Sequence, residues 1–163
     1  MSPSTSLQFT VYGRPQQKGS KRVVPLRNAN RPFAVVEDNP RAKSWAQQVS
    51  YAAAEARAAT GEAQAPLIRE GVMVRLLFYF ARPKGHYGTG RNAAVLKASA
   101  PPLMVSMPDV DKLARCTLDA LTGVVFADDA QIVRLMAGKD YGEPERVEVD
   151  LRVLGAASSG EVA

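Results

Sequence analysis

The chain has 163 residues, 46% of them hydrophobic and 23% charged, which is enough to bury one core and ordinary for a globular domain. Its formal net charge of +5 favours an anionic partner, nucleic acid first. A single cysteine, Cys116, excludes an intrachain disulfide and a cysteine-based zinc site, and neither a membrane-length apolar run nor a signal peptide is present, so a reduced, cytoplasmic protein without a membrane partner is expected.

The first forty residues predict two short strands around a basic loop. Residues 7–12 (LQFTVY) have strand composition and end at a Gly-Arg-Pro turn. Residues 16–22 (QQKGSKR) read as a polar, basic loop, and residues 32–36 predict a second strand that pairs with a neighbour. Cations crowd this region: Arg14, Lys18, Lys21, Arg22, Arg27, Arg31, Arg41 and Lys43.

A helix is predicted next. Asn39 is a good N-cap, Pro40 suits the first helical position, and Gly61 ends an alanine-rich run that extends to about Ala59. Five residues of this run fall on one face at helical spacing, which predicts a face that packs on the core or on a dimer partner. They are Trp45, Val49, Ala52, Ala53 and Ala56.

Residues 71–80 (GVMVRLLFYF) are the strongest strand pattern and predict a central position in a sheet. Residues 81–102 form a long excursion with three glycines, a length typical of functional or mobile loops. Leu103 to Ser106 predict a short returning strand. The excursion carries a second group of positive or titratable residues: Arg82, Lys84, His86, Arg91 and Lys97.

The last third predicts a helix and two strands. The helix begins at Asp109 or Asp111, reaches Leu121 and is stopped by Gly123. Residues 131–137 and 146–154 predict strands joined as a hairpin by a Gly-Glu-Pro turn, the second with clean alternation. The element order predicts a single α+β domain over residues 1–154, with a mixed sheet and two main helices, followed by a disordered tail, 155–163.

Four aspartates frame the second helix in two groups: Asp109 with Asp111, and Asp128 with Asp129. Converging carboxylates repel each other and usually need a cation, and Mg²⁺ takes oxygen ligands from one or two carboxylates plus substrate phosphates. The pattern therefore indicates a metal site facing a phosphate ester. Other interpretations remain open, because one Asp at a helix start is commonly a cap and an Asp-Asp pair is commonly a turn.

On the helix, Asp111, Arg115 and Asp119 are spaced i, i+4 and i+8, so they share one face. Asp119 could simply pair with Arg115. The opposite face can cover the core with Leu113, Ala114, Thr117, Ala120 and Leu121.

The sequence lacks the residues that other kinds of catalytic or cofactor site require. His86 is the only histidine, it lies on a basic loop, and no G-x-S-x-G elbow accompanies it. Neither a Walker-type phosphate loop nor a G-x-G-x-x-G after a strand is present, so no small-molecule cofactor is expected.

The stretch PDVDKLARCTLDALTGVVFADDAQI resembles the signature of the RusA family of Holliday junction resolvases in its phage-type form. The family pattern is roughly P-D-x-D-N-L-x-K, then D-A-L-x-G, then D-D-x-Q-[IV], then a lysine on the next strand. GRPQQKGSKR and RPKGHYGTGRN resemble loops of the family, and the resemblance covers about residues 7–154. The matching residues are Pro108, Asp109, Asp111, Leu113, Asp119, Ala120, Leu121, Gly123, Asp128, Asp129, Gln131, Ile132 and Lys139.

Two positions depart from the pattern. Lys112 stands where the family has asparagine, and Arg115 stands where it has lysine. Arginine keeps the charge but has a different shape. Neither change removes an expected metal ligand.

The resemblance implies a homodimer with an α+β fold that cleaves four-way DNA junctions with Mg²⁺, or Mn²⁺ in its place. It makes Asp109, Asp111 and Asp129 the metal ligands, Asp128 a supporting acid, and Arg115 the substitute for the catalytic lysine. Lys139 would add positive charge near the phosphate. The residues expected to track the DNA backbone are Lys18, Lys21, Arg22, Arg82, Lys84 and Arg91.

Three functions remain in competition: a junction-resolving endonuclease, another structure-selective metal nuclease acting on flaps or single strands, and a catalytically weak junction-binding protein. The last would follow if Lys112 and Arg115 impair the chemistry. Cleavage of a four-way junction beside duplex and flap controls separates the three.

Overall fold

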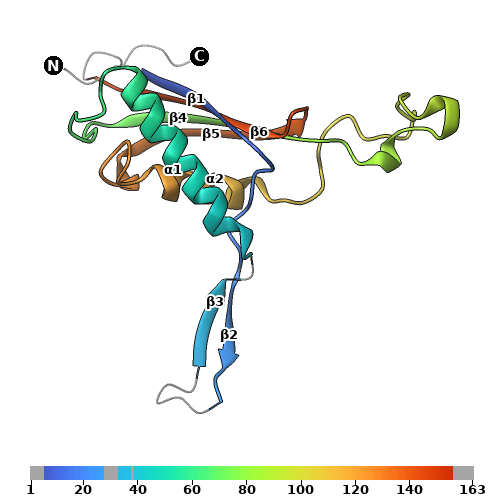
Figure 1. The fold of residues 1–163 in the computed structure, drawn as a ribbon, viewed down its shortest axis with the longest axis horizontal. Coiled ribbons are helices and arrows are strands. Elements are labelled where there is room, and N and C mark those ends of the chain that lie inside the picture. Colours follow the sequence, from blue (N-terminus) through green and yellow to red (C-terminus); the bar gives the residue numbers. More distant parts are fainter. Residues whose placement is uncertain (1–5, 28–32, 38, 156–163) are drawn as a thin grey trace.

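A mixed four-stranded sheet carries two helices on one face, and a separate two-stranded hairpin projects from the body (Figure 1). The computed structural model describes residues 6–27, 33–37 and 39–155. The elements in chain order are β1 (Ser6–Tyr12), β2 (Lys21–Pro25), β3 (Phe33–Glu37), α1 (Arg41–Ala59), β4 (Val72–Phe80), α2 (Val110–Leu121), β5 (Ile132–Tyr141) and β6 (Arg146–Val153).

The predicted fold class is confirmed: the domain is α+β, with a mixed sheet and two main helices. No described helix is long and apolar enough to span a membrane. Residues 156–163, most of the predicted disordered tail, lie outside the described residues. The homodimer stays a prediction.

The sheet order is β1-β6-β4-β5, so β4 is an inner strand, as its apolar sequence predicts. β5 runs parallel to β4, whereas β6 runs antiparallel to both β4 and β1. The predicted hairpin between residues 131–137 and 146–154 is therefore wrong, because β4 lies between the two strands.

The turn after β5 has to cross the end of β4 to reach β6. The N–H of Gly142 donates to the carbonyl of Phe80 at 2.9 Å. A Cβ at Gly142 would lie 2.8 Å from the Tyr79 ring, so only glycine lets the chain pass this closely. The Gly-Glu-Pro sequence forms a turn, as predicted, but this turn connects β5 to β6 across the end of β4.

Two further strand predictions are corrected. Lys21–Pro25 is a strand, although part of it reads as a basic loop, because it pairs along its length with β3, with Val23 opposite Val35 and Val24 opposite Ala34. Leu103 to Ser106 form no strand: Leu103 and Val105 are exposed, and the only buried residue there is Met104. A strand needs a neighbouring strand for its backbone hydrogen bonds, and these residues pair with neither sheet of the described chain.

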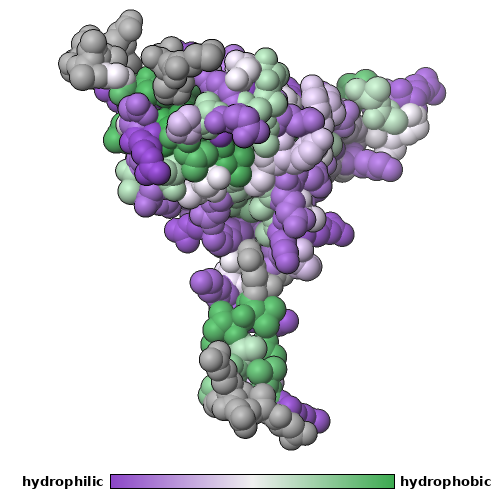
Figure 2. Space-filling model, turned by 60° about the vertical axis from the view of Figure 1, so that its left-hand side comes forward, coloured by the Kyte–Doolittle hydropathy of each residue, from purple (hydrophilic) through white to green (hydrophobic). Residues whose placement is uncertain are grey.

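The hairpin of β2 and β3 is here called the arm. It stands clear of the sheet and helices in Figure 1, and Figure 2 shows its surface as largely apolar. Its strands are in register from Lys21 with Glu37 to Pro25 with Phe33.

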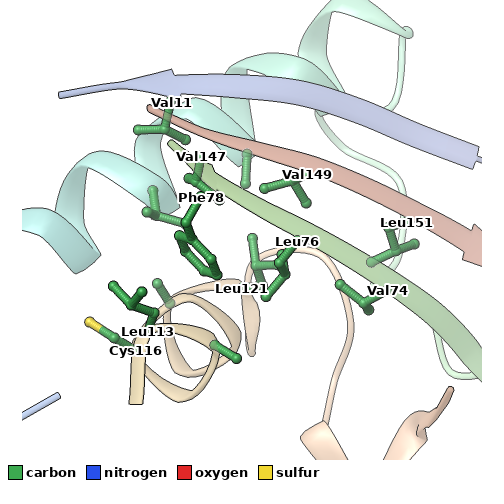
Figure 3. Packing of buried hydrophobic residues seen from close by; sticks show 14 of the residues in the cluster. Val11, Val74, Leu76, Phe78, Leu113, Cys116, Leu121, Val147, Val149 and Leu151 are labelled. Carbon is green, nitrogen blue, oxygen red and sulfur yellow. The ribbon is translucent and has the colours of Figure 1, made fainter. Parts of the chain in front are cut away.

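The core lies between the sheet and the two helices. The inner face of β4 contributes Val74, Leu76 and Phe78, none of which has any exposed surface (Figure 3). Leu113 and Leu121 of α2 meet them from the opposite side. Trp45, Val49 and Ala53 are the buried face of α1, which confirms the predicted packing face as a core face. This core fixes α2, and with it the side chains that α2 turns outward.

Candidate active site

The side chains of helix α2 form one buried face and one exposed face at helical spacing. The predicted inner residues Leu113, Ala114, Thr117, Ala120 and Leu121 are all buried. Asp111, Arg115 and Asp119 are exposed on the opposite face, at the predicted i, i+4 and i+8 spacing. The prediction that Gly123 ends the helix is also confirmed, because Gly123 has a φ of +78° just after the last residue of α2.

This outer face of α2 lines a cavity of about 440 Å³, here called the carboxylate cavity. Asp129 reaches it from the 3-10 turn before β5, so Asp111 and Asp129 share one cavity although eighteen positions separate them. Arg115 and Asp119 line it as well. The remaining wall is apolar: Val110, Ala114, Leu118, Leu135 and Ala137.

Asp109 does not line this cavity. It occupies the N-cap position of α2, but its side chain makes no capping hydrogen bond. Its carboxylate instead lies 3.1 Å from the ammonium of Lys112, one of the two departures from the family pattern. Its backbone N–H donates to the side-chain oxygen of Gln17 at 2.7 Å.

Asp128 caps the short 3-10 helix Asp129–Gln131. Its carboxylate accepts from the N–H of Ala130 at 2.9 Å, and its own N–H donates to the Gln131 side chain at 2.8 Å. Gln131 in turn donates to the carbonyls of Ile68 and Glu70, at 3.0 Å each. This small network holds the turn that carries Asp129 against the body. For Asp128, the turn interpretation of an Asp-Asp pair is the one its contacts support.

Asp119 pairs with the ammonium of Lys18, not with Arg115. The backbone N–H of Lys18 also donates to the carbonyl of Lys112 at 3.1 Å. Lys18 and Gln17 therefore tie the segment at the base of the arm to the first turn of α2. The sequence marks both residues only as members of a basic loop, and contacts between residues 92 and 101 positions apart leave no local signal.

Lys139 has a positioning role in this structure. Its ammonium donates to the carbonyls of Ser106 at 2.6 Å and Pro108 at 2.7 Å. Because both carbonyls belong to the segment that leads to Asp109, Lys139 fixes the chain that enters α2.

The remaining predicted DNA contacts are scattered over the projecting parts. Lys21 and Arg22 are exposed on β2, and Lys84 and Arg91 are exposed on the excursion 81–102. Arg82 is engaged internally: it donates to the carbonyl of Pro101 at 2.9 Å and lies 4.1 Å above the centre of the Tyr141 ring.

The donor chemistry of the carboxylate cavity suits a hard divalent cation. Within residues 6–27, 33–37 and 39–155, no group of three or more His, Cys, Asp or Glu side chains is arranged to hold a metal. Mg²⁺ does not require one, since it keeps several waters and commonly binds one or two carboxylates together with substrate phosphates. Asp111 and Asp129 supply that number in one cavity, and Arg115 adds a cationic donor beside them.

Two comparisons with known proteins bear on this site. The sequence model of the family described as Endodeoxyribonuclease RusA matches residues 13–152. The chain is also 30% identical over 153 residues to a Bacillus subtilis (strain 168) protein named Uncharacterized protein YqaN, an alignment that covers 92% of this chain and 98% of that protein. The family match includes both loops that resemble family loops, all of α2 and the turn that carries Asp129.

Proposed function

The chain belongs to the endodeoxyribonuclease RusA family, and from that membership we propose that it is a divalent-metal-dependent endonuclease that resolves four-way DNA junctions. Its product would be two symmetric nicks, made by a homodimer with one site in each subunit. The observation that carries the proposal is the shared cavity of Asp111, Arg115 and Asp129, because these residues come from separate parts of the matching motif.

In the proposed mechanism, Asp111 and Asp129 would hold the cation, and Asp109 would be a further ligand once its carboxylate is free of Lys112. A divalent cation held there would supply Lewis-acid chemistry, activating the attacking water and offsetting negative charge on the phosphate. Arg115 donates its planar fork of N–H groups to the scissile phosphate and stabilises the charge that develops there. Attack in line with the leaving 3′-oxygen would yield a 3′-hydroxyl and a 5′-phosphate.

The surrounding residues keep this arrangement in place. Lys18 neutralises Asp119, so that a third carboxylate in the cavity does not add to the repulsion between Asp111 and Asp129. The apolar wall lowers the local dielectric around the phosphate and strengthens its contact with Arg115. Lys139 anchors the segment before Asp109.

The test is cleavage of a synthetic four-way junction in Mg²⁺, beside a linear duplex, a flap and a single strand. We expect paired nicks at symmetric positions on opposed strands of the junction. Nicks mainly on the flap or the single strand would show that the protein is a structure-selective nuclease of another kind and not a junction resolvase. Binding of the junction without cutting, in Mg²⁺ and in Mn²⁺, would contradict the enzymatic proposal.

Lys112→Asn restores the residue of the family pattern and should make metal binding easier. Lys112 lies 3.1 Å from the Asp109 carboxylate, so its charge competes with a cation for that ligand. We expect the Mg²⁺ concentration for half-maximal junction cutting to fall about fivefold, the equivalent of about 1 kcal/mol for a partly exposed ion pair. Lys112→Arg keeps the charge and should leave the Mg²⁺ requirement unchanged. An equal requirement in wild type and Lys112→Asn would show that Lys112 does not compete with the metal.

Lys84→Ala combined with Arg91→Ala should weaken junction binding and flatten its salt dependence. Both side chains are exposed on the excursion 81–102. Each lost phosphate contact lowers the slope of log affinity against log salt by about 0.9, so we expect a decrease of about 1.8. Arg69→Ala removes an exposed cation at the opposite end of β4 and should leave the slope unchanged. A double variant with the wild-type slope would remove the excursion from the DNA interface.

A further inference from the structure

The chain that leads from the excursion 81–102 into α2 exposes large apolar side chains (the yellow segment before α2 in Figure 1). Leu103, Val105 and Met107 are 65%, 82% and 66% exposed, and they are here called the entry residues. Single exposed apolar residues are ordinary in folded proteins. Three of them within five consecutive positions, directly before the candidate active site, indicate a surface that contacts another molecule.

Contacts on both sides hold this segment in place. Met104, between the entry residues, is only 8% exposed and belongs to the hydrophobic core. Arg82 donates to the carbonyl of Pro101 just before the segment, and Lys139 donates to the carbonyl of Ser106 within it. A surface that is already ordered loses little conformational entropy when a partner binds. The entry residues are therefore exposed on a fixed backbone.

The charge of the surrounding chain favours DNA as the partner. Residues 71–108 contain no Asp or Glu. Their charged residues are all cationic: Arg75, Arg82, Lys84, Arg91 and Lys97. DNA combines phosphates, which suit the exposed cations of the excursion, with base faces, which suit apolar side chains. A DNA partner accounts for both the charge and the apolar surface of this part of the chain.

Apolar side chains of this kind contact DNA where the base stack is open. In a continuous duplex each base face is covered by the next base pair, and an apolar wedge has to unstack a step before it can enter. At the branch point of a four-way junction the strands change partners and the stack is already interrupted. The entry residues therefore fit a branch point better than an uninterrupted duplex.

The entry residues are also close enough to the candidate active site to act on the same DNA. Met107 and Asp109 are two positions apart, so their Cα atoms are separated by at most about 7 Å, and Leu103 lies at most about 22 Å from Asp109. A DNA strand advances by about 3.4 Å per nucleotide. The entry residues can thus reach bases within about six nucleotides of a phosphate held beside α2.

We propose that Leu103, Val105 and Met107 insert against the bases at the branch point of a four-way junction and hold them unstacked while a nearby phosphate lies in the carboxylate cavity. This inference rests on the proposed function and adds the residues that select a branched substrate over continuous duplex. The entry residues position the DNA and take no part in breaking the phosphodiester bond.

The first test measures base unstacking without cutting. One synthetic junction carries 2-aminopurine, whose fluorescence rises when it leaves the base stack, at the branch point, and a second carries it within a duplex arm. Both are titrated with the full-length protein in the absence of divalent metal. We expect a rise at the branch point and none in the arm. Val105→Ser combined with Met107→Ser should abolish most of the rise.

Val105→Ile combined with Met107→Leu is the matched control, because it keeps both positions apolar. This variant should show the wild-type rise in fluorescence. Since both side chains are exposed, neither pair of substitutions should unfold the protein, and thermal melts verify this. Sedimentation equilibrium of all three proteins verifies that the serine variant keeps the mass of the wild type.

The second test measures single-turnover cutting in Mg²⁺ at saturating protein. On a fully paired junction the serine variant should cut about tenfold more slowly than the wild type, because it lacks the apolar contacts that hold bases unstacked. A junction with mispaired nucleotides around its branch point already has unstacked bases, so the variant should approach the wild-type rate there. Damage to the active site itself would slow cutting equally on both junctions.

Four results would overturn the proposal. They are a wild type that binds the junction without a rise in fluorescence at the branch point, a serine variant with the wild-type rise, a serine variant equally slow on paired and mispaired junctions, and a serine variant of altered mass, which would assign the entry residues to a contact between copies of the chain. A wild type that unstacks the branch point but cuts no DNA would instead refute the proposed function and support the role of the entry residues.

Discussion

Asp111→Asn is expected to lower the rate of junction cutting by about a hundredfold to a thousandfold, the loss typical of removing one charge-stabilising group from an active site. Asp111 and Asp129 line the carboxylate cavity from different elements, so each would supply a charged ligand to the cation. Asparagine keeps the shape of the side chain and removes the charge. Asp129→Asn should lose a similar amount.

Junction affinity and junction cutting are measured separately, so that a loss of catalysis is distinguished from a loss of DNA binding. Junction affinity of Asp111→Asn, measured without metal, should stay within about twofold of wild type, because DNA affinity rests mainly on cations that contact phosphates. Asp140→Asn makes the same chemical change at an exposed position of β5 outside the cavity and should cut normally. If Asp111→Asn cuts at the rate of Asp140→Asn, the cavity is not the metal site.

Phe78→Ala should reduce the free energy of unfolding by about 4 kcal/mol, the usual cost of emptying a phenylalanine site in a packed core. Phe78 lies on the inner strand β4, has no exposed surface, and points toward Leu113 and the neighbouring part of α2 (Figure 3). The sheet and α2 meet across this ring, so the neighbours cannot easily close the cavity that alanine would leave. Urea denaturation monitored by circular dichroism measures the change.

The control is Leu103→Ala, which removes an apolar side chain that is 65% exposed and should cost less than about 0.5 kcal/mol. Phe78→Leu should fall between the two variants, because it keeps most of the buried volume. Since α2 carries Asp111 and Arg115, Phe78→Ala should also lose junction cutting at a lower temperature than wild type. A loss of stability below about 1 kcal/mol would mean that the ring is not central to the contact between the sheet and α2.

Features that depend on local periodicity could be predicted from the sequence. The 3.6-residue spacing of α2 separates Asp111, Arg115 and Asp119 from the buried leucines, and the alternation of β6 turns Val147, Val149 and Leu151 inward. The apolar run of β4 indicates an inner strand, and Gly123 ends α2. Each follows from side-chain directions that the backbone of a single element imposes.

Features that depend on which distant segments meet were decided by the tertiary structure alone. β5 joins β4 in parallel, so the turn at Gly142 crosses over a strand instead of closing a hairpin. Asp109 pairs with Lys112 and Asp128 caps its own turn, and of the four framing aspartates only Asp111 and Asp129 line the carboxylate cavity. The physical reason is that strand pairing and ion pairing are chosen among many competing long-range contacts, whereas sequence period reports only which face of an element is apolar.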